Sequence, residues 1–150
     1  PKAAALFARR TGFSLEETGL WKREVSGLPL AASPDRLLVG QNAILEIKCP
    51  AKLAAVRDST IVQATLQLLV TQRDVCWVTV YVPPSVKIYQ LFFDSDLAEL
   101  LLLALEPIHG ELKRPVPASE KSLPFMTPLM RRDLKTALKQ TRDGYLRPWG

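Results

Sequence analysis

An aspartate on a turn and a Glu-x-Lys set in a strand-like run are the residues of this chain that could do chemistry together. Asp35 follows a Ser-Pro pair, and Glu46 and Lys48 lie in the apolar run 43–48. Side chains i and i+2 of a strand point to the same face, so Glu46 and Lys48 should project together while Ile47 points into a core. Two carboxylates and an ammonium at one point would bind a hard cation beside an activated water.

The run 43–48 is expected to be a strand that pairs antiparallel with the strand before it. Residues 30–35 read as that earlier strand, with 36–40 as its continuation or turn, and a short connection of this kind favours a hairpin. Pro50 stops the second strand. The hairpin would bring Asp35 close to the Glu-x-Lys set.

A helix is expected over 59–71, after the strand that Pro50 ends. Gln63 and Gln67 lie four residues apart and so share one face of that helix. The predicted apolar stripe of this helix consists of Val62, Leu66, Leu69 and Val70.

The remaining pattern indicates an α/β domain with a central mixed sheet and helices on both faces. The expected elements are a helix over 1–10 ended by Thr11-Gly12, strands over 75–82 and 86–93, a helix from Asp94 or Ser95 to 105 or 113, and a basic helix from Thr127-Pro128 to about 141.

Composition places the chain among ordinary globular proteins. Its 150 residues suit one compact domain, and its net charge of +5 suits a polyanionic partner. The longest apolar run, 97–105, is too short to span a bilayer, so no membrane role is expected. Two cysteines and one histidine, Cys49, Cys76 and His109, make neither a zinc site nor an iron–sulfur cluster. Both thiols are expected to be reduced and buried in an intracellular protein.

The positive charge is concentrated near the C-terminus. From residue 113 onward there are nine basic residues against three acidic ones. Two interpretations of the basic helix stay open: its cations contact a DNA backbone, or they form a solvated face whose Met130, Leu134 and Leu138 stripe docks on the core or on a second subunit. The cations predicted to contact DNA are Arg131, Arg132, Lys135 and Lys139.

The ordered set of motifs resembles the PD-(D/E)XK nucleases, and within them the branch of lambda exonuclease and the YqaJ-type viral recombinases. The matching parts are Ser-Pro-Asp at 33–35, Leu-Glu-Ile-Lys-Cys-Pro at 45–50, and Gln63 on a helix that leads into Val70-Thr71. The resemblance covers roughly residues 1–113. It implies a restriction-endonuclease-like core over 1–113. The Pro-rich linker and basic helix over 114–150 lie beyond the matched part and are expected to pack on the same domain.

The resemblance also implies roles for individual residues. Asp35 and Glu46 would bind Mg²⁺, for which Mn²⁺ is expected to substitute, with the Ile47 carbonyl as a further oxygen ligand. Lys48 would position the attacking water and stabilise charge on the phosphate, and Gln63 would orient the phosphate or the lysine.

Other positions depart from the family pattern. The family's glycine after the aspartate is Arg36 here, and its second helix glutamine falls at Thr65, with Gln67 nearby. A further metal-binding glutamate of the family falls just before Pro1, so the N-terminal helix is expected to be truncated. Ser33, Arg36 and Gln67 are expected to contact nucleic acid.

The function that the resemblance implies is a Mg²⁺-dependent double-strand 5′–3′ DNA exonuclease for recombination or for viral or phage genome processing. Family members often form a ring-shaped trimer around DNA and work with a single-strand annealing protein. The alternatives are an endonuclease of the alkaline-nuclease type, acting on DNA or RNA, and an inactive nuclease fold that binds DNA or scaffolds a complex. The expected location is the cytoplasm or nucleoid, or the nucleus for a protein of eukaryotic-virus origin.

Overall fold

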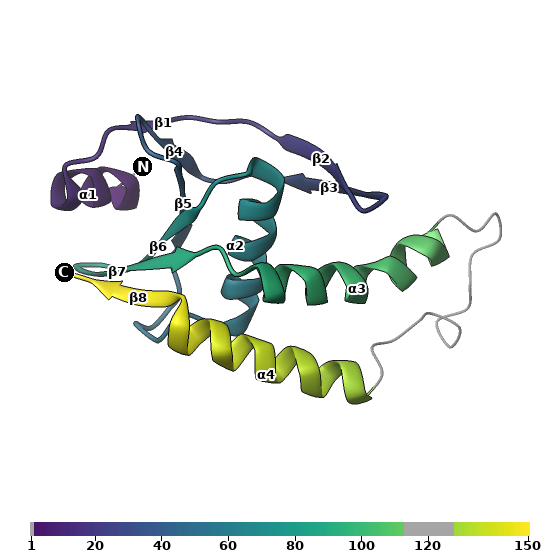
Figure 1. Cartoon of the computed structure of the whole chain (residues 1–150). Coiled ribbons are helices and arrows are strands. Elements are labelled where there is room, and N and C mark those ends of the chain that lie inside the picture. Colours follow the sequence, from purple (N-terminus) through teal and green to yellow (C-terminus); the bar gives the residue numbers. More distant parts are fainter. Residues whose placement is uncertain (1, 113–127) are drawn as a thin grey trace.

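A mixed six-stranded sheet forms the centre of the protein (Figure 1). The structure is a computed structural model, and it describes residues 2–112 and 128–150. The strand order is β1-β4-β5-β6-β7-β8, and the predicted α/β class is confirmed. The strands of this sheet are β1 (Leu15–Glu16), β4 (Arg36–Leu38), β5 (Ala43–Lys48), β6 (Val75–Val82), β7 (Ser85–Phe92) and β8 (Leu146–Trp149).

The strand that carries the Glu-x-Lys set lies inside the sheet. β5 pairs antiparallel with β4, which lies in the segment 36–40 expected to continue the earlier strand or to form a turn, and parallel with β6 on its other side. The parallel pair is joined by helix α2 (Asp58–Thr71), because two parallel strands need a crossover connection. β5 is therefore held from both sides.

The predicted strand over 30–35 is wrong in its second half. β3 (Leu28–Ala32) pairs with β2 (Trp21–Val25) in a separate two-stranded sheet, and the chain joins the main sheet only at β4. Pro34 has no N–H to donate to a ladder, which favours a break between the two sheets. Asp35 therefore lies in the short link between two strands and not within one.

The helices cover both faces of the main sheet, as predicted (Figure 1). Helix α1 (Lys2–Thr11) packs on one face, where Phe7 joins a buried cluster with Leu45 and Trp77. Helix α2 packs on the other face, where Ile61 and Leu68 join a cluster with Ile44. Successive side chains of β5 thus alternate between the two clusters.

The apolar stripe predicted for α2 is not its most buried face. The side chains that are almost fully buried are Ile61, Ala64, Thr65 and Leu68. Of the predicted stripe, Val70 is buried and Val62, Leu66 and Leu69 are half-buried. The reason is that α2 contacts the sheet, the β2–β3 pair and α3 together, so apolar residues line more than one side of it.

The C-terminal part of the chain is tied to the same core. Helix α3 (Ser95–Leu112) is capped by the preceding Asp94, whose Oδ1 accepts hydrogen bonds from the backbone N–H of Asp96 at 3.1 Å and of Leu97 at 3.4 Å. The Thr141 hydroxyl, near the end of helix α4 (Pro128–Gly144), donates to Asp94 Oδ2 at 2.7 Å. This buried bond joins the start of α3 to the end of α4.

Helix α4 and β8 extend the core beyond the part covered by the family resemblance. Leu134, Ala137 and Leu138 of α4 belong to or pack against the cluster on the α2 face, so this part of the predicted apolar stripe docks on the core. β8 pairs antiparallel with β7 and was not predicted from the sequence. The predicted linker over 114–124 lies outside the described residues. Among the helices that are described, none has the length and apolar character needed to cross a membrane.

Candidate active site

Strand β5 presents Glu46 and Lys48 to the face covered by α2. Lys48 Nζ lies 2.7 Å from Glu46 Oε1, so the two side chains project together as the strand period predicts. The Glu46 residue is only 4% exposed. Ile47 points the other way and packs against the Phe7 cluster.

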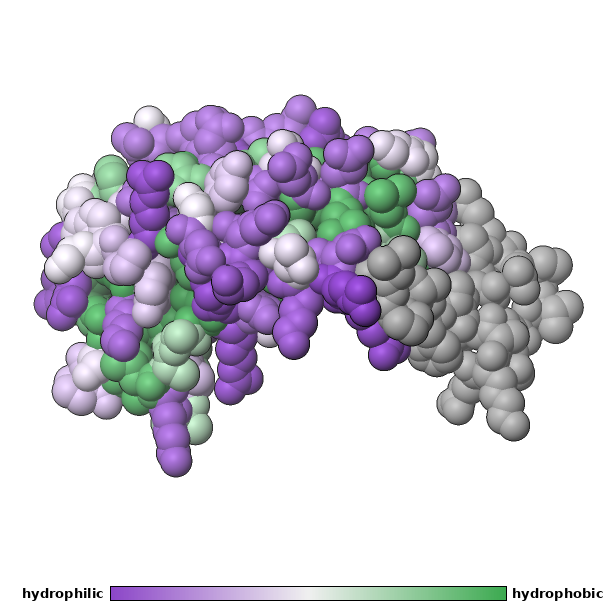
Figure 2. All heavy atoms as spheres, turned by 60° about the horizontal axis from the view of Figure 1, so that its bottom comes forward, coloured by the Kyte–Doolittle hydropathy of each residue, from purple (hydrophilic) through white to green (hydrophobic). Residues whose placement is uncertain are grey.

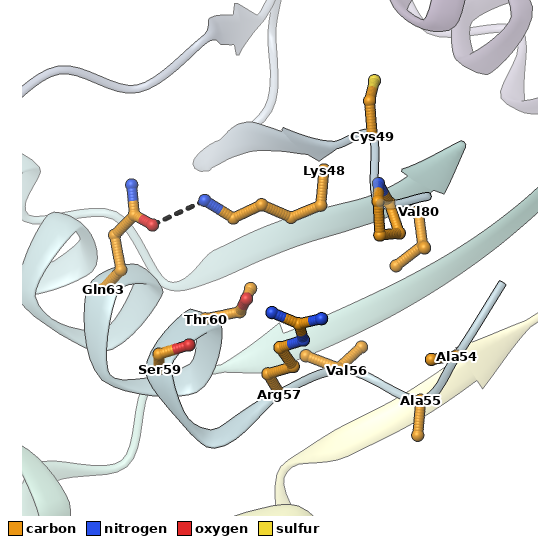
Figure 3. Close-up of a pocket in the computed structure, with 11 residues that line it drawn as sticks. Lys48, Cys49, Ala54, Ala55, Val56, Arg57, Ser59, Thr60, Gln63 and Val80 are labelled. Atoms are coloured by element: carbon orange, nitrogen blue, oxygen red, sulfur yellow. Dashed lines mark hydrogen bonds between the residues drawn. The ribbon is translucent and has the colours of Figure 1, made fainter. Parts of the chain in front are cut away.

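Helix α2 contributes two amide side chains to the same carboxylate. Gln63 Nε2 donates to Glu46 Oε1 at 2.9 Å, and Gln67 Nε2 donates to Glu46 Oε2 at 3.0 Å. The Gln63 Oε1 atom in turn accepts from Lys48 Nζ at 2.6 Å, a contact drawn in Figure 3. Four residues separate the two glutamines, which places both on the helix face that looks at β5.

Asp35 reaches the strand from the link before β4. Its Oδ2 accepts a hydrogen bond from the backbone N–H of Ile47 at 2.6 Å, and its own N–H donates to the Leu45 carbonyl at 3.1 Å. Because Ile47 is the residue between Glu46 and Lys48, the Asp35 carboxylate is fixed beside the Glu-x-Lys set. The structure thus brings together Asp35, Glu46, Lys48 and Gln63.

The donor set suits a small, hard divalent cation. A carboxylate offers about four acceptor positions, and the hydrogen bonds that Glu46 accepts from Lys48, Gln63 and Gln67 leave one position on its Oε2. Asp35 uses one position of its own for Ile47. Within residues 2–112 and 128–150 no three His, Cys, Asp or Glu side chains form a metal cluster. Two carboxylates are enough for Mg²⁺, which keeps several of its waters.

The two cysteines differ in their surroundings. Cys76 is buried on β6, and burial raises the pKa of its thiol well above the usual value, with the negative charges of Glu46 and Asp35 raising it further. This thiol therefore stays neutral and does not act as a thiolate ligand. Cys49 is exposed, so the prediction that both thiols are buried is wrong for it. It follows the end of β5, where the chain leaves the sheet.

The residues predicted to contact nucleic acid are exposed, with the exceptions of Arg36 and Gln67. Ser33 is exposed, as are the four α4 cations Arg131, Arg132, Lys135 and Lys139. Arg36 Nη1 donates to the Asp35 carbonyl at 2.6 Å, and its Nη2 lies 3.6 Å from Glu17 Oε1. Arg36 starts β4 and does not have a positive φ, so the backbone there has no need of the family's glycine.

Gln67, which was predicted to contact nucleic acid, lies inside the acid cluster. It is 4% exposed, and its Nε2 holds the Glu46 carboxylate. Its Oε1 is buried without a hydrogen-bond partner among the described residues. An amide must turn its N–H toward a carboxylate, which leaves the oxygen on the other side. The family register points to Thr65 instead, which is buried in the core.

Sequence reasoning missed a second group of polar residues beside this cluster. Arg57, Ser59 and Thr60 line a cavity of about 350 Å³ together with Lys48 and Gln63 (Figure 3). The signal that could have found them is the Ser-Thr pair in the first turn of the predicted helix, which follows Arg57 and Asp58.

Solved structures with the same fold include an alkaline exonuclease. The crystal structure of LHK-Exo, an alkaline exonuclease from Laribacter hongkongensis, matches with a TM-score of 0.60 at 18% identity, over 95% of this chain and 68% of that chain. Its complex with dAMP matches with a TM-score of 0.55 at 21% identity over the same shares. The crystal structure of SSO0001 matches with a TM-score of 0.55 at 15% identity, over 79% of this chain and 59% of that one.

The comparisons of sequence add no further relative. No protein-family model matches the chain, and no curated protein matches it either. The matched solved structures are 15–21% identical to this chain, so they show a shared fold. The chain therefore has the fold of the alkaline exonuclease LHK-Exo, and the fold expected from its resemblance to the PD-(D/E)XK nucleases is confirmed.

Proposed function

We propose that this protein is a Mg²⁺-dependent deoxyribonuclease of the exonuclease type that hydrolyses phosphodiester bonds. The observation that carries the proposal is the buried Glu46 carboxylate, joined to Lys48, Gln63 and Gln67 and adjacent to Asp35. Glu46 is buried and held by three neighbours, on a fold shared with an alkaline exonuclease. These features favour a role in phosphoryl transfer over the alternative that Glu46 is a solvated surface charge.

Asp35 and Glu46 are the residues that would hold the metal, with the Ile47 carbonyl as a third oxygen ligand. When bound there, Mg²⁺ would polarise the phosphate and lower the pKa of a water. The protein contributes a fixed geometry: Ile47 N–H holds Asp35, and the two glutamines of α2 hold Glu46. Ligands fixed in this way need little reorganisation when the substrate binds.

Lys48 is placed to act on the substrate. A lysine ammonium has three N–H donors, and those of Lys48 serve Glu46 at 2.7 Å and Gln63 at 2.6 Å. The third N–H remains for an oxygen of the phosphate or for the attacking water. Lys48 can therefore stabilise the charge that develops on the phosphate while its position is held by two acceptors.

The basic face of α4 is a second part of the proposal. Arg132, Lys135 and Lys139 line a groove of about 430 Å³ with Asp58 and Arg142. Figure 2, which turns the α4 side of the molecule forward, shows a broad hydrophilic surface. Because the apolar side of α4 is used for packing on the core, the exposed Arg131, Arg132 and Lys135 can neutralise backbone phosphates. Lys139 is also exposed but lies 3.9 Å from Asp143 Oδ2.

Digestion of end-labelled DNA tests the proposed reaction. We expect linear duplexes to be shortened from an end in Mg²⁺, circular duplexes to resist, and EDTA to stop all cleavage. Cleavage of the circles would instead identify an endonuclease. Binding without cleavage in either metal, Mg²⁺ or Mn²⁺, would contradict the enzymatic proposal and favour a DNA-binding scaffold.

Neutralising the basic face should weaken DNA binding without changing its sequence preference. We expect replacement of Arg131, Arg132, Lys135 and Lys139 by Gln to reduce the slope of log affinity against log salt by up to about 0.9 for each phosphate that is no longer neutralised. The measurement is fluorescence anisotropy on a duplex over a salt series. An unchanged slope would show that α4 serves packing only.

A further inference from the structure

The cavity beside the acid cluster has a polar end that the proposed hydrolysis does not use. It shares Lys48 and Gln63 with the candidate active site and continues to the segment before α2 and to the first turn of that helix (Figure 3). Arg57, Ser59 and Thr60 line this end. A ligand in the cavity would therefore lie directly beside a phosphate bound at Lys48.

The first turn of α2 offers unused donors to this cavity. Arg57 is the N-cap residue of the 14-residue helix and makes no side-chain cap hydrogen bond. Its carbonyl accepts from the N–H of Thr60 at 3.0 Å and of Ile61 at 3.1 Å, whereas the N–H groups of Asp58 and Ser59 have no partner among the described residues. Free N–H groups at the positive end of a helix favour an anion.

Thr60 gives an independent indication of a ligand. It is 6% exposed and lines the cavity, and its hydroxyl has no hydrogen-bond partner within the described part of the chain. In Figure 3 its side chain points from the helix toward the space between Lys48 and Arg57. The rest of the residue is buried, but the hydroxyl is not one of the fully buried atoms, so it faces the cavity and can donate to a group that enters from outside the protein.

The charges around the cavity also favour an anion. The Arg57 side chain is exposed and has no ion-pair partner among the described residues. The nearby Asp58 carboxylate is bound by Arg142 Nη2 at 2.6 Å, on the side of α4. The positive charge of Arg142 therefore offsets the negative charge of the Asp58 carboxylate, which then repels an anion in the cavity less.

We propose that this cavity binds a backbone phosphate of the nucleic-acid strand, next to the phosphate that is cut. Arg57 would contribute the charge, and the Thr60 hydroxyl and the N–H groups of Asp58 and Ser59 would donate hydrogen bonds. The inference rests on the proposed nuclease function and adds the path that the bound strand would take over the surface. Because Asp58 also lines the α4 groove, the strand would pass from Lys48 around the start of α2 to the basic face.

Binding measurements on three variants test this site. We expect Arg57→Gln to weaken binding of a single-stranded oligonucleotide in EDTA about tenfold and to reduce the salt slope by about 0.7. Thr60→Val should weaken binding about threefold with no change in slope, because the hydroxyl is uncharged. Arg9→Gln is the matched control, since it removes the same charge from exposed α1 on the opposite face of the sheet. A loss of stability in Thr60→Val without a loss of affinity would overturn the role of Thr60.

Oligonucleotides with a single neutral methylphosphonate linkage locate the phosphate that the cavity binds. Wild-type protein should lose about tenfold in affinity at one linkage position. Arg57→Gln should show no further loss at that same position, because its interaction with that phosphate is already absent. An equal penalty in both proteins at every linkage would overturn the proposal.

Inorganic phosphate separates this inference from the proposed function. Its titration should shift the backbone N–H resonances of Asp58 and Ser59 in the wild type and not in Arg57→Gln. If the protein neither cuts nor binds DNA but shows these shifts, the nuclease proposal fails and the phosphate site stands. If it cuts DNA, and Arg57→Gln leaves the KM and these resonances unchanged, the phosphate site alone fails.

Discussion

Glu46→Gln should reduce Mg²⁺-dependent cleavage by about a thousandfold or more while the protein stays folded. The substitution keeps the shape of the side chain but removes the charge that would bind the metal. It should be tolerated in the fold because Gln67 can turn its amide over, so that its unpartnered Oε1 accepts from the new N–H. The measurements are single-turnover cleavage and thermal unfolding.

The control for this variant is Glu99→Gln. Glu99 is an exposed carboxylate on α3, outside the candidate site, so its loss should leave cleavage unchanged. Cleavage by Glu46→Gln at the wild-type rate would remove Glu46 from the active site and with it the assignment of the whole cluster.

Lys48→Met should lower the cleavage rate by about 10²- to 10³-fold and leave metal binding intact. Methionine keeps an unbranched apolar stem, and the substitution removes the ammonium that lies between Glu46 and Gln63. Because the competing cation is then gone from Glu46 Oε1, Mg²⁺ should bind at least as tightly as in the wild type. Calorimetric titration with Mg²⁺ alone therefore distinguishes this variant from Glu46→Gln, in which Mg²⁺ binding should weaken.

Loss of Lys48 should also destabilise the fold by about 1–3 kcal/mol, because it leaves a buried carboxylate without its counter-ion. The Lys48 side chain is about one-third exposed (34%), which keeps the expected loss below that of a fully buried pair. Lys22→Met on β2 is the matched control for charge, since Lys22 is exposed and outside the cluster. A Lys48→Met protein that cuts at the wild-type rate would contradict the proposed role.

Local periodicity explains which features could be predicted. The strand period places Glu46 and Lys48 on one face, and the helix period places Gln63 and Gln67 on one face, so both pairs follow from spacing alone. The bounds predicted for β6, residues 75–82, are those observed, because a run of β-branched and aromatic residues leaves little alternative.

Features that depend on distant contacts were predicted less well. β8 has four residues and forms because α4 delivers it to the edge of β7, which no local pattern shows. The burial of α2 follows from the main sheet, the β2–β3 pair, α3 and α4 all packing on it, so a single stripe could not describe it. Cys49 adjoins the Glu-x-Lys strand but is exposed, because the chain leaves the sheet at that residue.

The sequence by itself determined that an acid and a lysine share one face of a strand, and that an aspartate precedes them on a turn. Both are properties of neighbouring residues and of backbone geometry. Only the tertiary structure decided that Asp35 accepts from Ile47 N–H, that Gln67 is a buried support for Glu46, and that the first turn of α2 lies beside Lys48. These contacts join separate elements, so they depend on how the strands and helices pack and not on the spacing of residues within one of them.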